Sequence, residues 1–479
     1  MTSRGDLYTP PVGSIPTLDV PSLEGVDRVH LIGIGGAGMR NLAKLLLARG
    51  VSVSGSDLKD TKGLVELREL GAEVTVGHDP ARLGEPDAVI VSSAIGDRNV
   101  ELAEARRLAI PVWARAQGLA ALAVGRRSIA VAGTHGKTTT TSMVSVVLEQ
   151  AGLEPSFLIG GDLNESGSGA RSGSGDTFVF EADESDGSFL LVDPAIGVIT
   201  NVEVDHVDFY PGGREEIERA FAEFAARCGQ VVACGDDAGV DAALNISCVS
   251  AVRYGTGDDN DWRLSVVGEG PGGAVGEVHG PGGARVELRL LVDGAHNLLN
   301  ATAAVVVAAL VGVSIAEAAE TLAAFKGVHR RFELRGNARG ANFYDDYGHV
   351  PTELAVTLEV ARRTGPRRLI AVFQPHRYSR TQVLWRELGD SLREADVLVV
   401  TDVYGADQDP IPGVTGKLVV DGAAETSSDT RIVYLPHRRD VVAFLVDEVR
   451  SGDLVVTMGC GDVWMLGDAA LERIREEAS

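Results

Sequence analysis

Along this chain, short apolar runs alternate with longer stretches whose apolar residues recur at helical spacing, as strands alternate with helices. The clearest case is the apolar run 128–132, which precedes a glycine turn and a helical pattern over 137–150. A strand over 29–32 and a helix ending at Arg49 follow the same order. Later strands over 368–373, 397–401 and 454–458 alternate with helical patterns over 351–364, 380–394 and 438–449. This alternation predicts an α/β protein with parallel sheets.

Three such units account for most of the chain. A length of 479 residues agrees with this number, because roughly 150 residues per domain is a fair prior. We expect an N-terminal Rossmann-like domain, a central domain with the parallel sheet of a P-loop ATPase, and a C-terminal Rossmann-like domain. The expected bounds are a polar tail over 1–24, then domains over 25–126, 127–330 and 331–479. Residues 258–292 alternate glycines with β-like runs, which indicates an insertion or a strand-rich edge.

The segment GTHGKTTT lies between the predicted strand 128–132 and the helix that begins at Lys137. Backbone N–H groups and the helix dipole at such a junction face an anion, the lysine reaches the outer phosphates, and the next hydroxyl can hold Mg²⁺. The full Walker pattern has a glycine at position 131, where this chain has Val131, so the loop is a shortened variant. The predicted ATP-binding residues here are Gly133, Thr134, His135, Gly136, Lys137, Thr138 and Thr139.

Acidic and histidine side chains follow the next two predicted strands. The strand 177–180 leads to Glu181, and the strand 195–200 leads to Asn201, Asp205 and His206. In an α/β sheet this edge carries the metal and ligand groups, and Mg²⁺ is held by one or two carboxylates plus phosphates. The predicted metal ligands are therefore Thr138, Glu181 and His206. A solvated acidic loop and a structural histidine are the alternatives.

A second glycine turn, Gly33 to Gly38, follows the strand 29–32, and Asp57 lies about 20 residues further on, as in a dinucleotide-binding unit. Another strand, 88–91, ends in Ser92 and Ser93. Taken alone, this turn favours an NAD-dependent oxidoreductase. An oxidoreductase of this kind would not explain why the chain has a further phosphate loop at Gly133.

Composition narrows the function classes. The net charge of −24 argues against nucleic acid as a partner, because neutralising phosphates needs clustered Lys and Arg. The four cysteines form no C-x-x-C pair, so their spacing indicates neither a zinc site nor a disulfide framework. The apolar stretch 303–313 is too short to span a bilayer, and the N-terminus has no signal-peptide pattern. We expect a cytoplasmic protein that binds no membrane.

Seven segments, in their order along the chain, resemble the motifs of the Mur ligases of bacterial peptidoglycan synthesis. They are GTHGKTTT, EADESDGSF, TNVEVDHVDFY, HNLLNATAA, FKGVHRRFE, DDYGHVPTE and FQPHRYSRT, within a resemblance that runs from about Val29 to Leu466. The resemblance implies a three-domain amide ligase that depends on ATP and Mg²⁺. The first domain would hold a UDP-sugar, the second ATP, and the third would admit the amino acid.

The resemblance also implies roles for single residues. Lys137 would contact the β- and γ-phosphates, Thr138 and Glu181 would hold one Mg²⁺, and His206 a second. Amides at Asn297 and Asn300 would contact the nucleotide, although asparagine also caps helices, and Arg331 and Asp346 would do so from the third domain. The implied catalytic residues are Lys137, Glu181, His206 and Arg331. The implied UDP-sugar residues are Gly33, Gly35, Gly36, Gly38, Asp57, Ser92, Ser93, His376, Arg377 and Arg380.

Two features indicate the branch of the family. Members that add later residues carry a lysine downstream of the Asp-His motif, whereas residues 207–230 contain none. FQPHRYSRT separates the chain from the related recycling ligase. The branch that remains joins L-alanine to the lactyl carboxylate of UDP-N-acetylmuramate through an acyl phosphate, as a monomer or homodimer.

Val350, Gly405 and Cys460 depart from the family pattern, where histidine, proline and alanine are usual. A non-catalytic, nucleotide-regulated binding protein is a third alternative.

Overall fold

The computed structural model describes residues 20–92, 95–161, 163, 168–206, 209–270, 273–406, 408–427 and 429–478. They divide into two compact units. The first runs to Val267 and includes Val275–Leu290 and Ala295–Lys326, and the second comprises Gly268–Ala274, Leu291–Gly294 and the chain from Gly327 on. Among the described residues, every helix is too short or too polar to serve as a membrane span.

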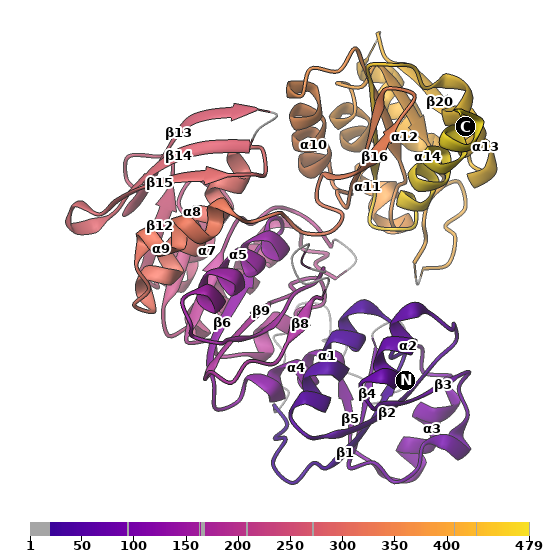
Figure 1. The fold of residues 1–479 in the computed structure, drawn as a ribbon. Coiled ribbons are helices and arrows are strands. Elements are labelled where there is room, and N and C mark those ends of the chain that lie inside the picture. Colours follow the sequence, from indigo (N-terminus) through magenta and orange to yellow (C-terminus); the bar gives the residue numbers. More distant parts are fainter. Residues whose placement is uncertain are drawn as a thin grey trace. The chain divides into compact units, whose positions relative to one another are not determined.

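The N-terminal sheet has five parallel strands in the order β3-β2-β1-β4-β5 (Figure 1). Its strands are β1 Arg28–Ile32, β2 Ser52–Asp57, β3 Glu73–Val76, β4 Ala88–Val91 and β5 Val112–Ala114. Its helices are α1 Ala37–Ala48, α2 Lys62–Glu69, α3 Val100–Arg107 and α4 Arg115–Ala123, with a 3-10 turn, η1, at Pro80–Arg82. Every residue of β4 is buried, because a parallel sheet carries helices on both faces.

The central sheet has ten strands in the order β15-β14-β13-β12-β11-β10-β6-β9-β7-β8. The strands are β6 Arg127–Ala132, β7 Ser156–Leu158, β8 Ala170–Arg171, β9 Thr177–Glu181, β10 Ile196–Ile199, β11 Val231–Cys234, β12 Ala251–Gly255, β13 Trp262–Gly270, β14 Gly273–His279 and β15 Arg285–Leu290. The helices are α5 Lys137–Gln150, α6 Arg214–Arg227, α7 Ala238–Ser247, α8 Ala295–Leu310 and α9 Ile315–Ala323, with 3-10 turns η2 Ser188–Leu191 and η3 Pro281–Gly283. The strand-rich edge expected over 258–292 is confirmed as β13 to β15. β8 pairs antiparallel with β7 at one edge, whereas the neighbouring strands from β7 through β9, β6, β10, β11 and β12 to β13 pair in parallel.

The C-terminal sheet has six strands in the order β16-β17-β21-β18-β19-β20. The strands are β16 Glu333–Ala338, β17 Ala341–Asp346, β18 Arg368–Phe373, β19 Val397–Val400, β20 Arg431–Tyr434 and β21 Asp453–Met458. The helices are α10 Pro351–Arg363, α11 Tyr378–Ser391, α12 Lys417–Thr426, α13 Arg438–Glu448 and α14 Trp464–Ala478. β16 and β17 form an antiparallel hairpin at one edge, whereas the other pairs are parallel.

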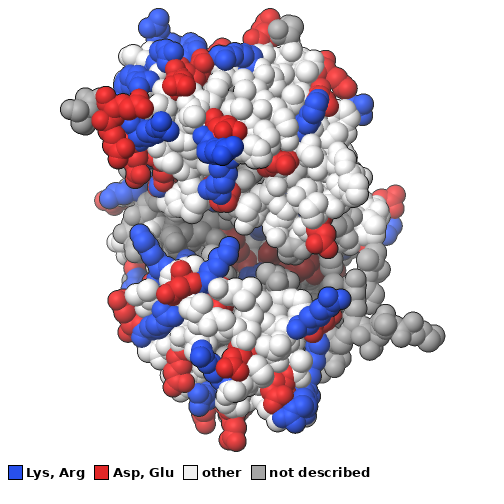
Figure 2. Space-filling view, turned by 90° about the vertical axis from the view of Figure 1, so that its right-hand side faces the viewer, with Lys and Arg blue, Asp and Glu red and all other residues white. Residues whose placement is uncertain are grey.

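The expected fold class, α/β with three sheets, is confirmed. Helix α10 forms where the sequence supplies a buried stripe: Leu354, Leu358 and Ala361 are fully buried, and Pro351 occupies the first turn. Acidic and basic side chains are interspersed on the face shown in Figure 2, so the excess of negative charge is not gathered in one patch of that face.

Candidate active site

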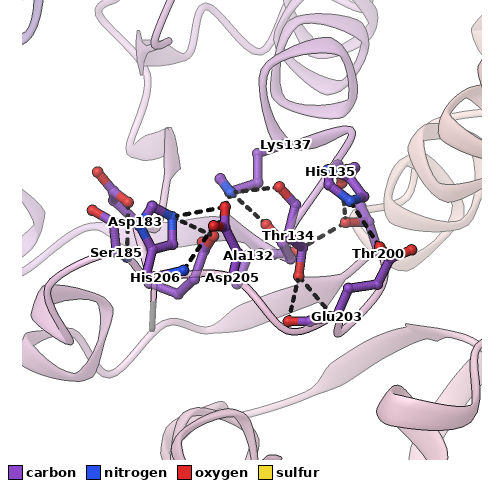
Figure 3. Close-up of polar contacts among 12 residues, drawn as sticks. Ala132, Thr134, His135, Lys137, Asp183, Ser185, Thr200, Glu203, Asp205 and His206 are labelled. Atoms are coloured by element: carbon purple, nitrogen blue, oxygen red, sulfur yellow. Dashed lines mark hydrogen bonds and ion pairs between the residues drawn. The ribbon is translucent and has the colours of Figure 1, made fainter. Parts of the chain in front are cut away.

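A tight turn joins β6 to α5 and forms the phosphate loop predicted from the sequence (Figure 3). Gly133 and Gly136 adopt φ angles of +137° and +78°, which side-chain-bearing residues rarely reach. A Cβ at Gly133 would lie 2.0 Å from Thr200 Oγ1, and one at Gly136 would lie 2.7 Å from Asn300 Oδ1. Both glycines are therefore required by conformation and by space, and the N-terminus of α5 is left facing the turn.

The loop after β10 fastens this turn from the other side. Asn201 Oδ1 accepts a hydrogen bond from the His135 amide at 2.8 Å, and Asn201 Nδ2 donates to the His135 carbonyl at 3.0 Å. Glu203 donates its backbone N–H to Thr134 Oγ1 at 2.8 Å, and its carboxylate lies 3.2 Å from His135 Nε2. These residues were not predicted as loop contacts, because only the fold brings the two loops together.

Lys137, the first residue of α5, directs its ammonium group back into the turn. Its Nζ donates to the Thr134 carbonyl at 3.2 Å (Figure 3). It also donates to Glu184 Oε1 at 2.9 Å and contacts the Gly133 carbonyl. Burial alone would lower the pKa of Lys137, but the charges of Glu184, Asp183 and Glu181 outweigh it and raise the pKa. A permanent positive charge therefore lies within the phosphate loop.

Two carboxylates near this ammonium have an oxygen without a hydrogen-bond partner among the described residues. The first is Glu181, the last residue of β9, whose Oε1 is buried and unpaired. The second is Glu184, whose Oε2 is buried and unpaired. Leaving a buried charged oxygen unpaired is costly. A cation held by carboxylate oxygens would remove this cost, and Mg²⁺ prefers such ligands. The residues present thus fit a divalent cation, and Glu184 joins this group although it is not among the metal ligands predicted from the sequence.

Burial and neighbouring charges set the protonation of this acidic group. For Asp183, burial is outweighed by the charges of Arg115, Lys137 and His206, which lower its pKa to about 2. For Glu184, burial and the charge of Asp183 raise the pKa to about 7, although Lys137 opposes the shift. One carboxylate is thus firmly ionised, while the second carries its charge at a cost.

His206 joins the same cluster from the loop after β10. Its backbone has φ +50°, an uncommon conformation for a non-glycine residue that recurs at functional sites. Its Nε2 lies 3.3 Å from Asp205 Oδ2 (Figure 3). It lies 3.9 Å from Glu184 Oε1. Tyr210 supports the arrangement by donating its hydroxyl to the Glu184 carbonyl at 2.6 Å. Lys137, Glu184 and His206 therefore form one contiguous cluster.

Asn297 and Asn300 lie within α8, which begins at Ala295, so neither is the residue that caps the helix. They are one turn apart on a shared face, as predicted, and Asn300 Nδ2 lies 3.5 Å from Asn297 Oδ1. Asn300 Oδ1 accepts from the Thr140 hydroxyl on α5 at 3.1 Å. Asn300 thus packs α8 against the helix of the phosphate loop.

In the N-terminal sheet, the glycine turn after β1 is closed by Asp57 at the end of β2. Asp57 Oδ2 accepts from the Gly35 amide at 2.9 Å, and Oδ1 accepts from the Lys59 amide at 3.1 Å. A Cβ at Gly35 would lie 2.8 Å from Asp57 Oδ2. Gly33 has φ +79° and Gly36 immediately precedes α1, so the amides of this turn surround a helix start. Such a start suits a pyrophosphate.

Two further residues of the predicted UDP-sugar set, Ser92 and Gly38, lie beside this turn. A Cβ at Gly33 would lie 3.1 Å from Ser92 Cβ, so Ser92 flanks the turn. A Cβ at Gly38 would lie 3.2 Å from Arg115 Nη1, an arginine that also lies 3.5 Å from Asp183 Oδ2. Ser93 lies outside the described residues.

The remaining predicted residues belong to the second unit. Asp346 is buried, and its carboxylate accepts from the Phe332 amide at 2.8 Å, the Gly348 amide at 2.8 Å and the Thr357 hydroxyl at 3.0 Å. Burial raises its pKa, although Arg331 opposes the shift. Its carboxylate therefore orders the loop that carries Arg331. Arg331 lies over the Tyr347 ring at 5.2 Å and 3.6 Å from Glu353.

His376, Arg377 and Arg380 follow β18 at the start of α11. Arg377 has φ +63° and donates its backbone N–H to the Tyr404 carbonyl at 2.9 Å. Arg380 is buried, and its Nη1 lies 3.1 Å from His376 Nδ1. The three residues thus form a fixed corner at the carboxyl edge of the sheet.

Comparison with known proteins gives the family of this fold and site. Three family models match in order along the chain: the Mur ligase family catalytic domain over 28–127, the Mur ligase middle domain over 131–308, and the Mur ligase glutamate ligase domain over 330–461. The chain belongs to the Mur ligase family, whose members are ATP-dependent ligases.

Individual relatives agree with this assignment. The chain is 43% identical over 463 residues to UDP-N-acetylmuramate–L-alanine ligase of Desulforamulus reducens, covering 95% of this chain and 100% of that protein. It is 47% identical over 468 residues to the enzyme of that name from Kineococcus radiotolerans, covering 95% and 98%. The crystal structure of UDP-N-acetylmuramate-alanine ligase from Thermotoga maritima has a TM-score of 0.80 at 28% identity, covering 94% of this chain and 99% of that one.

Proposed function

We propose that this enzyme joins L-alanine to the lactyl carboxylate of UDP-N-acetylmuramate, with conversion of ATP to ADP and phosphate. The observation that carries the proposal is the cluster of Lys137, Glu181, Glu184 and His206 beside the phosphate loop, in a chain covered by the three family models. The relatives named for this reaction share nearly the full length of the chain.

In the first step, an oxygen of the lactyl carboxylate attacks the γ-phosphorus of ATP. A carboxylate oxygen–phosphorus bond forms, the bond to the β,γ-bridging oxygen breaks, and ADP leaves. Lys137 compensates the charge that spreads over the transferred group, since phosphoryl transfer depends on positioning and electrostatics more than on covalent catalysis. The amides of Gly133 to Thr138 hold the phosphates in line at the start of α5.

In the second step, the amine of L-alanine attacks the carbonyl carbon of the acyl phosphate. A carbon–nitrogen bond forms, the carbon–oxygen bond to phosphate breaks, and the amine proton is lost to solvent. No side-chain nucleophile is needed, because the acyl phosphate is already activated. Arg331, from the second unit, would stabilise the phosphate charge, and exclusion of water would protect the acyl phosphate.

Thr138, Glu181 and His206 are the residues we assign to Mg²⁺, with Glu184 as an additional carboxylate. When bound, Mg²⁺ would neutralise phosphate charge during transfer. The unpaired buried oxygens of Glu181 and Glu184 support this assignment.

We assign the UDP pyrophosphate to the turn of Gly33, Gly35, Gly36 and Gly38, and the uridine nucleotide further to His376, Arg377 and Arg380. We assign Asn297, Asn300 and Asp346 to the ATP site. Asn300 also holds α8 against the phosphate-loop helix through the Thr140 hydroxyl, and Asp346 orders the loop of Arg331 through the Phe332 amide. The predictions of a monomer or homodimer and of a cytoplasmic location remain predictions.

Isotope transfer tests the chemistry directly. If UDP-N-acetylmuramate carries ¹⁸O in both oxygens of its lactyl carboxylate, the mechanism predicts one ¹⁸O in each phosphate released and one in the amide product. Mass spectrometry of both products measures this. Phosphate without label would mean that the carboxylate does not attack ATP, and the proposal would fail.

A further inference from the structure

Three adjacent strands of the C-terminal sheet end at the same level and deliver soft metal ligands to one place. Asp346, Met458 and Phe373 are paired in register as the last residues of β17, β21 and β18. His349, Cys460 and His376 follow these three ends. One ligand atom from each residue lies within 4.8 Å of the other two. The juxtaposition follows from the order of the parallel strands and from no local sequence pattern.

We propose that His349, His376 and Cys460 form a binding site for a soft divalent cation, of which Zn²⁺ is the natural example. Two imidazoles and one thiolate are donors that Zn²⁺ prefers, and three protein ligands leave the fourth tetrahedral position open. The set differs in kind from the oxygen-rich group around Glu181, which suits Mg²⁺.

The surroundings hold both imidazoles in defined orientations. His349 Nδ1 lies 3.2 Å from the Tyr347 carbonyl and 3.5 Å from Glu353 Oε2, the kind of partner that orients a metal-ligating histidine. The His376 ring stacks on Tyr404 with centroids 6.0 Å apart, and it meets the His349 ring edge-on at 5.6 Å. Binding therefore requires little reordering of the two rings.

Burial and nearby charges act on the pKa of the Cys460 thiol in opposite directions. Burial and the charge of Glu353 raise this pKa, to about 12, whereas the guanidinium groups of Arg380 and Arg330 favour the thiolate. A coordinated thiol loses its proton outright, so binding forms a sulfur–metal bond and releases one proton to solvent, with no change of oxidation state. Arg380 donates to His376 Nδ1, so a cation that takes this lone pair displaces the guanidinium.

One consequence rests on the proposed function. His376 and Arg380 are among the residues we assign to the UDP-sugar, so an occupied site should slow ligation. Cation binding itself is measured without substrates, which keeps a failure of this site distinguishable from a failure of the proposed function.

Cobalt spectroscopy on the full-length, chelator-treated protein tests the site. With Co²⁺ added in the presence of excess Mg²⁺, we expect one equivalent to give the sulfur-to-metal charge-transfer absorption and the intense visible bands of tetrahedral coordination. Cys460→Ala should abolish the charge-transfer absorption. The matched control is Cys248→Ala, which removes an exposed thiol of the same chain and should leave the spectrum unchanged.

Competition titration with Zn²⁺ gives the second readout. Loss of an outer partner typically lowers metal affinity about 10–100-fold, so loss of a ligand in Cys460→Ala or His349→Ala should lower it at least ~100-fold. Thermal unfolding checks that each variant is folded. A wild-type spectrum without charge-transfer absorption, or Zn²⁺ affinity unchanged in folded Cys460→Ala, would overturn the proposal.

Discussion

Replacing Glu184 by glutamine should change how the stability of the metal-free protein depends on pH. In the folded protein, burial and the charge of Asp183 raise the pKa of Glu184 from 4.5 to about 7. A carboxyl group with a raised pKa contributes stability that is fully present below its unfolded pKa and is lost as pH rises through its folded pKa. The relevant window is therefore about pH 4.5 to 7.

The size of the effect follows from the two pKa values. A difference of about 2.5 units between about 7 and 4.5, at 1.36 kcal/mol per unit, gives about 3 kcal/mol lost across the window. Asp183 and Glu101 do not change the pH dependence of stability between about pH 4.5 and 7. The pKa of each is lowered to about 2, so their contributions are lost only at lower pH. Glutamine keeps the shape of the side chain and can still accept a hydrogen bond from Lys137, but it does not titrate.

Urea unfolding of both proteins between pH 4.5 and 8, in metal-free buffer, measures the effect. The transition that reports on Glu184 is the one that added ATP shifts to higher urea, because ATP stabilises the part of the chain that holds the phosphate loop. We expect wild-type stability to fall relative to Glu184→Gln as pH rises, by about 3 kcal/mol in total. Glu215→Gln is the control, because the Glu215 side chain is 81% exposed and should not alter the slope. Equal pH slopes for wild type and Glu184→Gln would refute the reasoning.

Three further predictions concern the sites. Lys137→Ala should abolish phosphate release while far-UV circular dichroism stays that of the folded protein, and an unchanged turnover number would remove the phosphate loop from the mechanism. Glu181→Ala and His206→Ala should each lower kcat at least ~100-fold, the scale of a lost electrostatic group. Raised Mg²⁺ should partly rescue the Glu181 variant. A near-normal kcat in either variant would contradict the role assigned to the residue it replaces. Gly35→Ala places a Cβ 2.8 Å from Asp57 Oδ2, so it should raise KM for UDP-N-acetylmuramate more than KM for ATP. Gly96→Ala meets no atom within 4 Å and is its control; equal effects of the two, or micromolar NAD affinity by calorimetry, would contradict the assigned pyrophosphate turn.

Sequence reasoning was most successful where the signal is local. The helix predicted over 137–150 has those bounds in the structure, because a strand, a glycine turn and an apolar stripe follow one another without interruption. β20 and α12 were not predicted. β20 has no fully buried residue, and α12 buries only Val419, Gly422 and Ala423, so neither produces a strong apolar pattern.

The parts of the site that depend on tertiary contacts could not be read from the sequence. Glu181 and Glu184 lie in one acidic run, so the sequence does not show which of them is buried. Glu184 is buried because Tyr210 packs against it and Lys137 forms an ion pair with it in the folded chain. Two further contacts depend on which strands are neighbours in the sheets. They are the hydrogen bond between Asn201 and the His135 amide and the proximity of Cys460 to His349. Residues 160–175 are rich in glycine and serine, a composition typical of an exposed loop. They nevertheless include β8, because pairing with β7 outweighs this composition.

The most direct test of the proposed function is phosphate release with ATP, Mg²⁺, UDP-N-acetylmuramate and single amino acids. We expect release only when the UDP-sugar and an amino acid are both present, with a higher kcat/KM for L-alanine than for glycine or L-serine. Steady release from ATP without the UDP-sugar, or no release in the complete mixture, would contradict the proposed function.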